Sequence, residues 1–517
     1  MTAFRFGFMI LDAMLIACSG QAALVLQIGQ NYTAAATPIA LPDAGLAVST
    51  NHVVQFIDGR YSVFSKSSGA LLQTMMAGSF WTNAGVTMPS GVFAATPRVL
   101  FDLDSQRWVV AMVDVPSNEL NNRFLLAITA TDDPAGPWRG AAVVADPSRG
   151  YFADFPTLGI DANAVYLGAD MFDDGGVAVG STLVSISKSA LLRNPPSLAG
   201  LTSFGLLSYS YYGAILQPAV TVGAASTGEI VLAVADLGYD FQPHSNLVAV
   251  TIQNTLVSDA AVLSNPAKFA VPAYFVPLNP AQPGAFDNID DGDARISATV
   301  YRVGDIVYAT HSTEMNDRAA VQWFKMDAVS LNVMDTGIVS DPILDLYYPS
   351  IAANQDGVVV MAFNGSSGSN FISSYAILGE PINGRLQFGS ILLLKDGVAS
   401  YRTNSASNPW GNYSATVVDP ADPARFWALT MYASSASAWG TQISELIAAP
   451  LLLSLSRTGT NILLSWPSAA AGYQLQFKDS LSSGNWASIP QAPVVNHNQF
   501  TVSLAASGKA QFFRLIK

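Results

Sequence analysis

Arginine, aspartate and aromatic residues recur at the beginnings of short apolar segments along this chain. Arginine pairs with carboxylates through two parallel hydrogen bonds, and aromatic rings offer flat apolar faces on which sugar rings stack. These residue types would suit a sugar or a carboxylated glycan as ligand. The competing prediction is that the Arg and Asp side chains satisfy each other and tie neighbouring elements together. The candidate ligand-binding residues are Arg98, Arg295, Tyr348, Trp410 and Asn412.

Two aspartates stand where a catalytic pair would. Glycosidases use two carboxyl groups about 5 to 10 Å apart across an open cleft, one as an acid and one as a base or nucleophile. Asp154 precedes one apolar segment, and Asp293 precedes another, next to Arg295. If these carboxylates are instead buried in ion pairs with Arg98 and Arg295, a catalytic role loses its best residues. The sequence leaves both alternatives open.

A run of acidic residues offers the hard oxygen ligands that Ca²⁺ prefers. Its spacing is not that of an EF-hand and no Glu stands at the closing position, so a solvated loop is the favoured alternative and no cofactor is expected. The four histidines are scattered and the chain has one cysteine, so a zinc site is not expected either. The calcium candidates are Asp287, Asp290 and Asp291, followed by Asp293.

The elements that would position these residues are short β-hairpins. Residues 348–363 comprise a short apolar segment, a polar turn ending in Asp-Gly and a second, nearly continuous apolar segment. Apolar runs joined by an Asp-Gly turn are typical of a β-hairpin. Comparable pairs of strands begin near Gly45, Thr96, Asp154, Gln217, Asp293, Tyr348 and Asn412.

These seven starts recur at intervals of about 60 residues. Aligned on proline, the steps are 59 (97 to 156), 62 (156 to 218) and 131 across two units (218 to 349). A small sheet cannot bury both faces alone, but sheets stacked around an axis can. The sequence therefore predicts an all-β protein containing a seven-bladed β-propeller, with six blades and a divergent cap as the alternative. Residues 24–28 or 442–447 would supply the strand that closes the ring.

The innermost strand of each blade begins at the central channel, so the candidate residues would gather at one mouth of that channel. In the proline-based alignment, Arg98 and Arg295 occupy equivalent positions. Other repeats have Thr157, Ala219 and Ser350 there.

The two ends of the chain differ from the repeats. Residues 1–22 have the length of a signal peptide, with Arg5 before an apolar run, and Cys18 lies in a segment that would suit lipidation. Residues 23–42 are expected to be a linker or closing strand, with a Thr/Ala/Pro linker at 33–42. The propeller is expected over 43–448. Short alternating strands over 449–517 predict a small β-sandwich like a fibronectin type III module.

Composition excludes some classes of partner. The net charge is −13 and the pI about 4.6, so nucleic acid would be repelled. Half of the residues are hydrophobic and 12% are charged, which indicates a large core. No transmembrane helix is expected, because no other segment approaches about 20 uninterrupted apolar residues. We expect a monomer that is secreted or lies on the bacterial cell surface as a lipoprotein.

Several phrases resemble a known group of proteins. Asn51-His-Val-Val-Gln, Gly292-Asp-Ala-Arg, Tyr348-Pro-Ser-Ile-Ala and Trp410-Gly-Asn-Tyr-Ser-Ala resemble secreted bacterial β-propellers near the sialidase-like superfamily. The tail resembles a C-terminal sandwich appended to many exported bacterial proteins. The resemblance covers residues 43–517 and implies the fold and export, with no particular reaction. The Asp-boxes of true sialidases do not occur here, and a third pocket arginine is not assigned.

Two functions are therefore expected to compete. The first is non-catalytic binding of a glycan or another extracellular polymer at the channel mouth. The alternative is a sialidase-like glycoside hydrolase that uses Asp154 and Asp293. Fold alone does not separate them, because propellers host both.

Overall fold

The computed structural model describes residues 23–38, 43–116, 121–198, 200–256, 260–284, 288–403, 408–468, 470, 472–482, 484–496, 499–506 and 511–517. Cys18, Asp287 and His497 lie outside these described residues, as do the expected signal peptide and lipidation site. The chain forms two compact units, Leu26–Ala449 and a second that combines the residues up to Val25 with Pro450–Lys517. Strands make up nearly all of the regular structure in both units, which confirms the all-β prediction.

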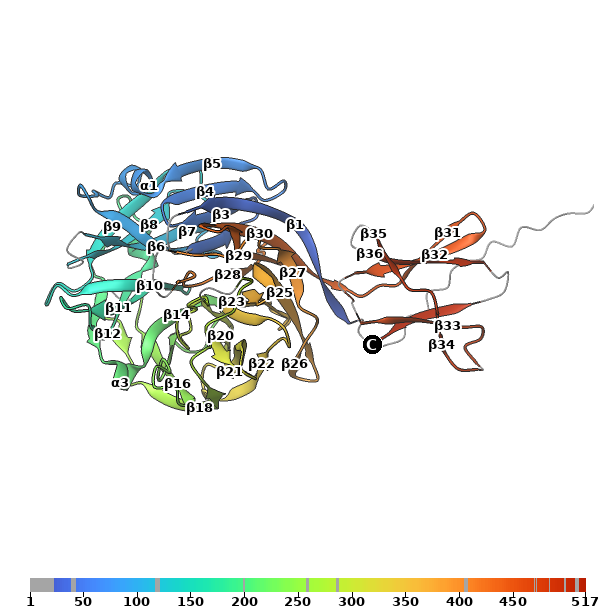
Figure 1. Cartoon of the computed structure of the whole chain (residues 1–517). Helices are drawn as coiled ribbons and strands as arrows, with labels where there is room; N and C mark the ends of the chain where they lie inside the picture. Colours follow the sequence, from blue (N-terminus) through green and yellow to red (C-terminus); the bar gives the residue numbers. More distant parts are fainter. Residues whose placement is uncertain are drawn as a thin grey trace, which may run out of the picture. The chain divides into compact units, whose positions relative to one another are not determined.

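The larger unit consists of successive antiparallel groups of strands that follow one another around a common centre (Figure 1). The first two groups are β2 (Ala44–Val48), β3 (His52–Ile57), β4 (Arg60–Ser65) and β5 (Leu71–Met76), then β6 (Phe93–Asp102), β7 (Arg107–Val115), β8 (Arg123–Thr129) and β9 (Trp138–Val144). The next two are β10 (Phe152–Ile160), β11 (Ala164–Phe172), β12 (Ala178–Ser187) and β13 (Thr202–Leu207), then β14 (Ala214–Val222), β15 (Glu229–Val234), β16 (His244–Gln253), β17 (Val262–Leu263) and β18 (Ala267–Tyr274).

The remaining groups follow the same plan. They are β19 (Val300–Val303), β20 (Ile306–Glu314), β21 (Ala319–Asp327) and β22 (Val333–Val339), then β23 (Asp345–Ala353), β24 (Val359–Ser367), β25 (Asn370–Ile382), β26 (Arg385–Phe388) and β27 (Leu392–Lys395), and finally β28 (Ala415–Val418), β29 (Arg425–Ser435) and β30 (Ala438–Pro450). Short helices stand between some strands: α1 (Ala77–Asn83), α2 (Lys188–Leu191) and α3 (Tyr209–Tyr212).

An N-terminal strand completes the last group. β1 (Leu24–Thr37) pairs with β30 in a sheet of order β1-β30-β29-β28. The two segments predicted as alternative closing strands, 24–28 and 442–447, therefore lie in one sheet and both contribute. β1 also runs through Thr33–Thr37, part of the stretch that was expected to be a linker.

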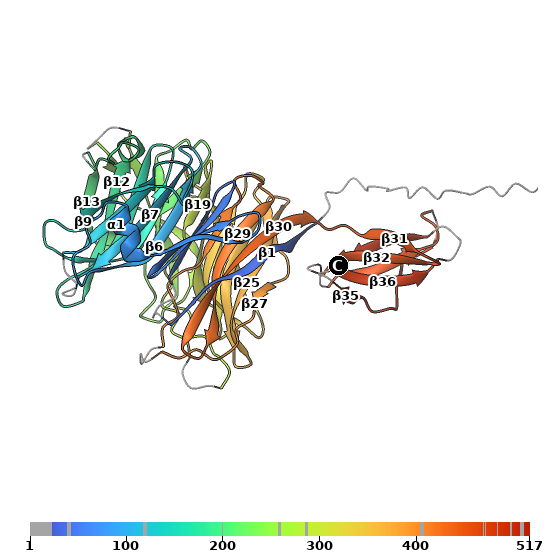
Figure 2. The same cartoon turned by 90° about the horizontal axis from the view of Figure 1, so that it is seen from above.

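The first strand of each group contacts the first strand of the next, from β2 through β6, β10, β14, β19 and β23 to β28, and β28 contacts β2. This ring of sheets is the architecture of a β-propeller. The count of seven blades stays a prediction, which these contacts support. Figure 2 shows the larger unit turned by 90°, so that the ring of sheets is seen from its edge.

The innermost strands approach so closely in one sector that they pair with each other. β14 pairs in parallel with β10 at Val220 and Ile160, and with β19 over Ala219–Val222. Gly159 permits this approach, because a Cβ there would lie 2.5 Å from the Ala219 carbonyl oxygen. Three groups consequently merge into one 13-stranded sheet.

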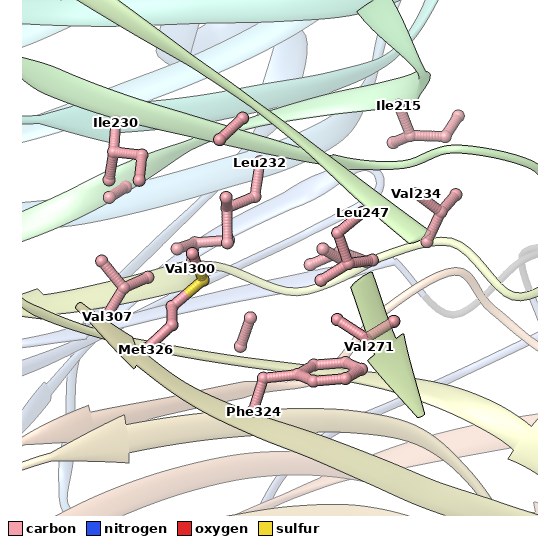
Figure 3. Packing of buried hydrophobic residues seen from close by; sticks show 14 of the residues in the cluster. Ile215, Ile230, Leu232, Val234, Leu247, Val271, Val300, Val307, Phe324 and Met326 are labelled. Atoms are coloured by element: carbon pink, nitrogen blue, oxygen red, sulfur yellow. The ribbon is translucent and has the colours of Figure 1, made fainter. Parts of the chain in front are cut away.

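Apolar side chains fill the spaces between neighbouring groups. Figure 3 shows one such cluster between the β14–β18 and β19–β22 groups, where Leu232, Leu247 and Ile215 from the first face Val307, Phe324 and Met326 from the second. All six side chains are buried. Because each sheet has an apolar neighbour on both faces, its strands read as continuous hydrophobic runs rather than as alternating ones.

The smaller unit contains two antiparallel sheets. One has the order β31-β32-β36-β35 and the other β34-β33-β37. Leu464, Trp466, Leu475 and Val502 form its buried centre. The strands are β31 (Ser454–Thr458), β32 (Asn461–Pro467), β33 (Gln474–Lys478), β34 (Ala487–Ser488), β35 (Val494–Asn496), β36 (Gln499–Ala505) and β37 (Phe512–Ile516). The likeness to fibronectin type III stays a prediction.

Candidate functional site at the start of the innermost strands

Four innermost strands share a backbone irregularity near their beginnings. The pairing register skips between Ala95 and Arg98 in β6, Asp154 and Thr157 in β10, Ala214 and Gln217 in β14, and Tyr347 and Ser350 in β23. Each skip contains a residue with a left-handed φ: Thr96 (58°), Phe155 (51°), Ile215 (60°) and Tyr348 (48°). Bulges of this kind redirect side chains, and left-handed non-glycine residues store strain that the surrounding structure must hold.

The bulges correct the proline-based alignment of the repeats. A proline follows the left-handed residue in three strands, at Pro97, Pro156 and Pro349, but Leu216 takes that place in β14. Gln217, not Ala219, is therefore the counterpart of Arg98. Arg295 lies outside strand β19 altogether, five positions before Val300, so it does not match Arg98 as predicted.

Arg98 is buried and holds innermost strands together. Its Nε donates to the Pro156 carbonyl oxygen at 2.9 Å and its Nη2 to the Ser297 carbonyl oxygen at 3.1 Å. The guanidinium carbon stands 3.5 Å from the centre of the Tyr413 ring. Burial lowers the pKa of Arg98, although Tyr413 and Asp43 oppose that shift. Two donors of this arginine and one face of its guanidinium group are thus bound by the protein itself.

Other residues at the level of Arg98 also bridge the innermost strands. The Gln217 amide donates to Ser297 O at 3.1 Å, and the Thr157 hydroxyl donates to Leu216 O at 2.7 Å. On the other side of the ring, the Ser350 and Thr416 hydroxyl groups lie 2.7 Å apart. These buried polar side chains link neighbouring innermost strands, as the alternative of a self-satisfied polar lining would require.

Arg295 and Asp293 form a bidentate ion pair above that layer. Arg295 Nε lies 2.7 Å from Asp293 Oδ1, and Nη2 lies 2.5 Å from Oδ2. The Tyr239 hydroxyl donates to the same Oδ2 at 2.7 Å. Burial alone would raise the pKa of Asp293, but the Arg295 charge and these hydrogen bonds outweigh it and lower the pKa. Asp293 is therefore a poor general acid, and its carboxylate is already engaged.

Phe155 joins the two arginines. Its ring centre lies 5.1 Å from the Arg98 guanidinium carbon and 4.8 Å from that of Arg295. The left-handed bulge in β10 places this ring between them. Nearby, Asp170 accepts a hydrogen bond from the Ser181 hydroxyl at 3.1 Å, and burial raises the pKa of Asp170 to about 6 although Arg295 lowers it.

A second acidic group lies beside Arg98. Asn412 Nδ2 donates to both carboxylate oxygens of Asp43 at 2.9 Å, so Asn412 is a partner of a buried aspartate. Burial raises the pKa of Asp43 to about 6. Asp58 accepts a hydrogen bond from the Thr96 backbone N–H at 2.8 Å, and burial together with the Asp43 charge raises its pKa well above the ordinary value. Asp154 is exposed and contributes a further negative charge to both.

The two predicted catalytic residues have different surroundings. Asp293 is enclosed with Arg295 and Tyr239, whereas Asp154 is exposed and its charge acts on Asp43 and Asp58. Sequence reasoning missed Asp43, Asp58, Asp170 and Tyr239. The sequence marks Asp58 by an Asp58-Gly59 pair, a pattern that predicts a hairpin turn and does not by itself indicate a buried carboxyl group.

Two predicted aromatic platforms are core residues. Trp410 is fully buried, its ring packs edge-on against Tyr401 with centroids 4.8 Å apart, and its Nε1 donates to the Asn364 side chain at 3.2 Å. Tyr348 is buried in the same cluster. Neither presents a ring face to a ligand. Exposed rings are found instead on the β15–β16 connection, at Tyr239 (61% exposed) and Phe241 (73% exposed).

The histidines do not form a common site among the described residues. His311 is fully buried, and its Nδ1 donates to the Ala294 carbonyl oxygen at 2.6 Å. His244 lies with Asp236 and Asp240 on one loop, and one ligand atom from each falls within 4.8 Å of the others. Both aspartates are exposed, and the His244 Nε2 is already 2.8 Å from Asp240 Oδ1.

A cavity of about 270 Å³ runs along the innermost strands. Backbone and apolar side chains of β2, β6, β14 and β28 make up most of its wall, with Arg98 and Tyr413 at one end and Asp102 and Asp104 at the other. Lys188 neutralises Asp102 at 2.8 Å. The charged residues therefore lie at the ends of this channel and not along it.

No helix in the described part of the chain is long and apolar enough to cross a membrane.

Comparison with known proteins yields no match to a protein-family model and none to a curated protein. Among solved structures, the WD40 repeats of RRP9 are similar at 9% identity with a TM-score of 0.42, over 83% of this chain and 99% of that one. A Trypanosoma rangeli sialidase bound to the inhibitor DANA is similar at 11% identity with a TM-score of 0.32, over 81% and 60%. An exo-1,5-alpha-L-arabinanase from a bovine ruminal metagenomic library is similar at 11% identity with a TM-score of 0.32, over 68% and 96%. The protein has the fold of a β-propeller, and its neighbours in that fold include catalytic and non-catalytic proteins.

Proposed function

We propose that the propeller binds uncharged saccharide units of an extracellular glycan at the mouth formed by Asp58, Asp154, Tyr239, Phe241 and Arg295. The observation that carries this proposal is the use of both arginines inside the protein. Arg98 is bound to backbone carbonyl groups, and Arg295 is neutralised by Asp293 through two hydrogen bonds.

The charge balance of the mouth favours a neutral ligand. The carboxyl groups of Asp43, Asp58, Asp154, Asp170 and Asp293 outnumber Arg98 and Arg295. Burial is the main cause of the raised pKa values of Asp43, Asp58 and Asp170. A carboxylated sugar would add another negative charge to this group at a Coulombic cost. Sugar hydroxyl groups, in contrast, donate hydrogen bonds to carboxylates.

The exposed rings supply the second requirement for saccharide binding. Tyr239 and Phe241 lie on the same loop, and the hydrogen bond from the Tyr239 hydroxyl to Asp293 anchors the first of them at the mouth. An exposed ring whose polar end is anchored loses little conformational entropy when a sugar stacks on it.

A glycan array probed with the full chain tests this function. Neutral glycans are expected to bind and sialylated or uronic-acid glycans are not. Tyr239→Ala and Phe241→Ala should each weaken binding about 10-fold or more, since a ring contact contributes roughly 1 to 2 kcal/mol. Val494→Ala, at a similarly exposed apolar position in the smaller unit, is the control. Preferential binding of acidic glycans, or no effect of the two ring substitutions, would contradict the proposal.

A hydrolytic function is the second candidate, carried by the contrast between two neighbouring carboxyl groups. The pKa of Asp58 is raised well above its ordinary value, as suits a general acid, and Asp154 is exposed, as suits a base. Release of reducing ends from a bound neutral glycan, lost in both Asp58→Asn and Asp154→Asn, would establish it. Binding without release leaves the non-catalytic function.

A further inference from the structure

One buried carboxylate of this protein has no hydrogen-bond partner among the described residues. Asp291 is 1% exposed, and neither of its side-chain oxygens forms a hydrogen bond with another described residue. Its neighbours in the sequence are satisfied: Asp290 Oδ1 accepts the Gly292 N–H at 3.1 Å, and Asp293 is bound by Arg295. A buried carboxylate left this way costs several kcal/mol of desolvation.

The surroundings of Asp291 increase that cost. Burial raises its pKa well above the ordinary value, and the like charges of Asp290, Asp345 and Asp293 raise it further. Asp345 is also buried, and its two oxygens accept the backbone N–H groups of Ala281 and Ala319 at 3.1 and 3.2 Å. Asp345 also has a cationic partner, since Arg318 Nη1 lies 3.7 Å from its Oδ2, and Asp293 is paired with Arg295. Asp291, unlike these two, has no ion pair among the described residues.

The segment that carries Asp291 is held in place by its backbone. Asp290 N donates to Asn408 O at 3.2 Å, and Trp410 N donates to Asp290 O at 3.1 Å. These bonds hold Asp290, the residue before Asp291, in a bridge with 408–410. The backbone next to the buried carboxylate is therefore fixed in place.

We propose that Asp291 is a ligand of a divalent cation of the Ca²⁺ type, with Asp290 as the second carboxylate. A proton would remove only the charge of Asp291, whereas a cation satisfies the charge and both oxygens together. The donors at this place are oxygens, which favour Ca²⁺ over transition metals. The cation would join the loop that bears Asp293 and Arg295 to the beginning of β23, where Tyr347 and Tyr348 lie close to Asp291.

Calorimetric titration of the EGTA-treated full chain with CaCl₂ tests the proposal, together with thermal unfolding in CaCl₂, in MgCl₂ and in EGTA. Binding of Ca²⁺ with an upward shift of the propeller transition is expected. At a free Ca²⁺ concentration 100-fold above Kd, the unfolding constant should fall about 100-fold. Asp291→Asn should abolish the shift. Asp174→Asn, on an exposed turn between β11 and β12, should preserve it.

The outcomes separate a cation from a proton. Ca²⁺ binding that is lost in Asp291→Asn supports the proposal. No heat of binding and no shift in the wild-type protein would overturn it, as would an unchanged shift in Asp291→Asn. If Asp291→Asn does not fold, Asp290→Asn serves instead, with at least a 10-fold weaker Ca²⁺ affinity as the supporting result and an unchanged affinity as the contrary one. Glycan binding is measured separately, so failure of either proposal is recognised by itself.

Discussion

Replacing Arg98 by lysine tests whether the central arginine is a structural residue or a ligand-binding one. Lysine preserves the positive charge, but it is a point donor that cannot span two carbonyl oxygens while stacking on a ring. In the structure, Arg98 reaches the carbonyl oxygens of Pro156 and Ser297 and stacks on Tyr413 at 3.5 Å.

The expected loss of stability in Arg98→Lys follows from these contacts. A hydrogen bond from a charged donor contributes about 1.5 to 3 kcal/mol, and a desolvated cation–π contact about 2 kcal/mol. Ser297 O retains its hydrogen bond from Gln217 in the variant, so only Pro156 O risks being left unsatisfied. We therefore expect Arg98→Lys to lower the free energy of unfolding of the propeller by about 2 to 4 kcal/mol.

Urea unfolding followed by tryptophan fluorescence measures this loss, and glycan binding to the folded variant is measured in parallel. Binding should be within about twofold of wild type. Arg149→Lys, at an exposed position, is the control and should change stability by no more than about 0.5 kcal/mol. Unchanged stability together with lost binding would refute the structural assignment of Arg98.

Three further predictions concern other parts of the propeller. The pKa of Asp170 is raised to about 6. The stability that protonated Asp170 contributes is therefore fully present below about pH 4 and is lost as the pH rises through 6. The free energy of unfolding of the wild type, measured with urea and compared with that of Asp170→Asn, should fall by on the order of 3 kcal/mol between pH 4 and 7.5. Trp410→Ala should cost about 3 to 5 kcal/mol in the same assay, because Trp410 is fully buried, and should leave the glycan affinity of the folded fraction unchanged. Gly29→Ala should lower the midpoint of thermal unfolding and reduce the free energy of unfolding by about 1 to 3 kcal/mol. The added Cβ would overlap the Glu445 carboxylate, which Arg425 holds at 2.5 Å. An unchanged midpoint would mean that β1 shifts freely against β30.

The sequence by itself determined the β architecture. Apolar runs joined by Asp-Gly and similar turns predicted the hairpins, and their recurrence predicted stacked sheets around a channel. The physical reason is local: turn residues and hydrophobic runs act within a few positions of the chain, so they can be recognised without knowing the partner sheet. The recurring prolines were also visible in the sequence. Prolines inside a central strand mark bulges rather than strand starts, and Pro218 lies two positions after Leu216, the residue equivalent to Pro97. The proline-based alignment was therefore displaced by two residues in β14.

Only the tertiary structure decided which polar residues share the mouth. Asp43 and Asp58 belong to the first group of strands, Asp170 and Tyr239 to the third and fourth, and Arg295 precedes β19. The ring brings these groups together, which no local pattern encodes. The burial of individual side chains could not be predicted from the sequence either. Trp410 and Asn412 are two positions apart, yet Trp410 is enclosed in the core and Asn412 donates hydrogen bonds to Asp43. Arg98 and Asp293 have side chains that suit a ligand, but in the fold Arg98 binds backbone carbonyl groups and Asp293 binds Arg295. Charged groups that already have a partner within the protein are not available to a ligand.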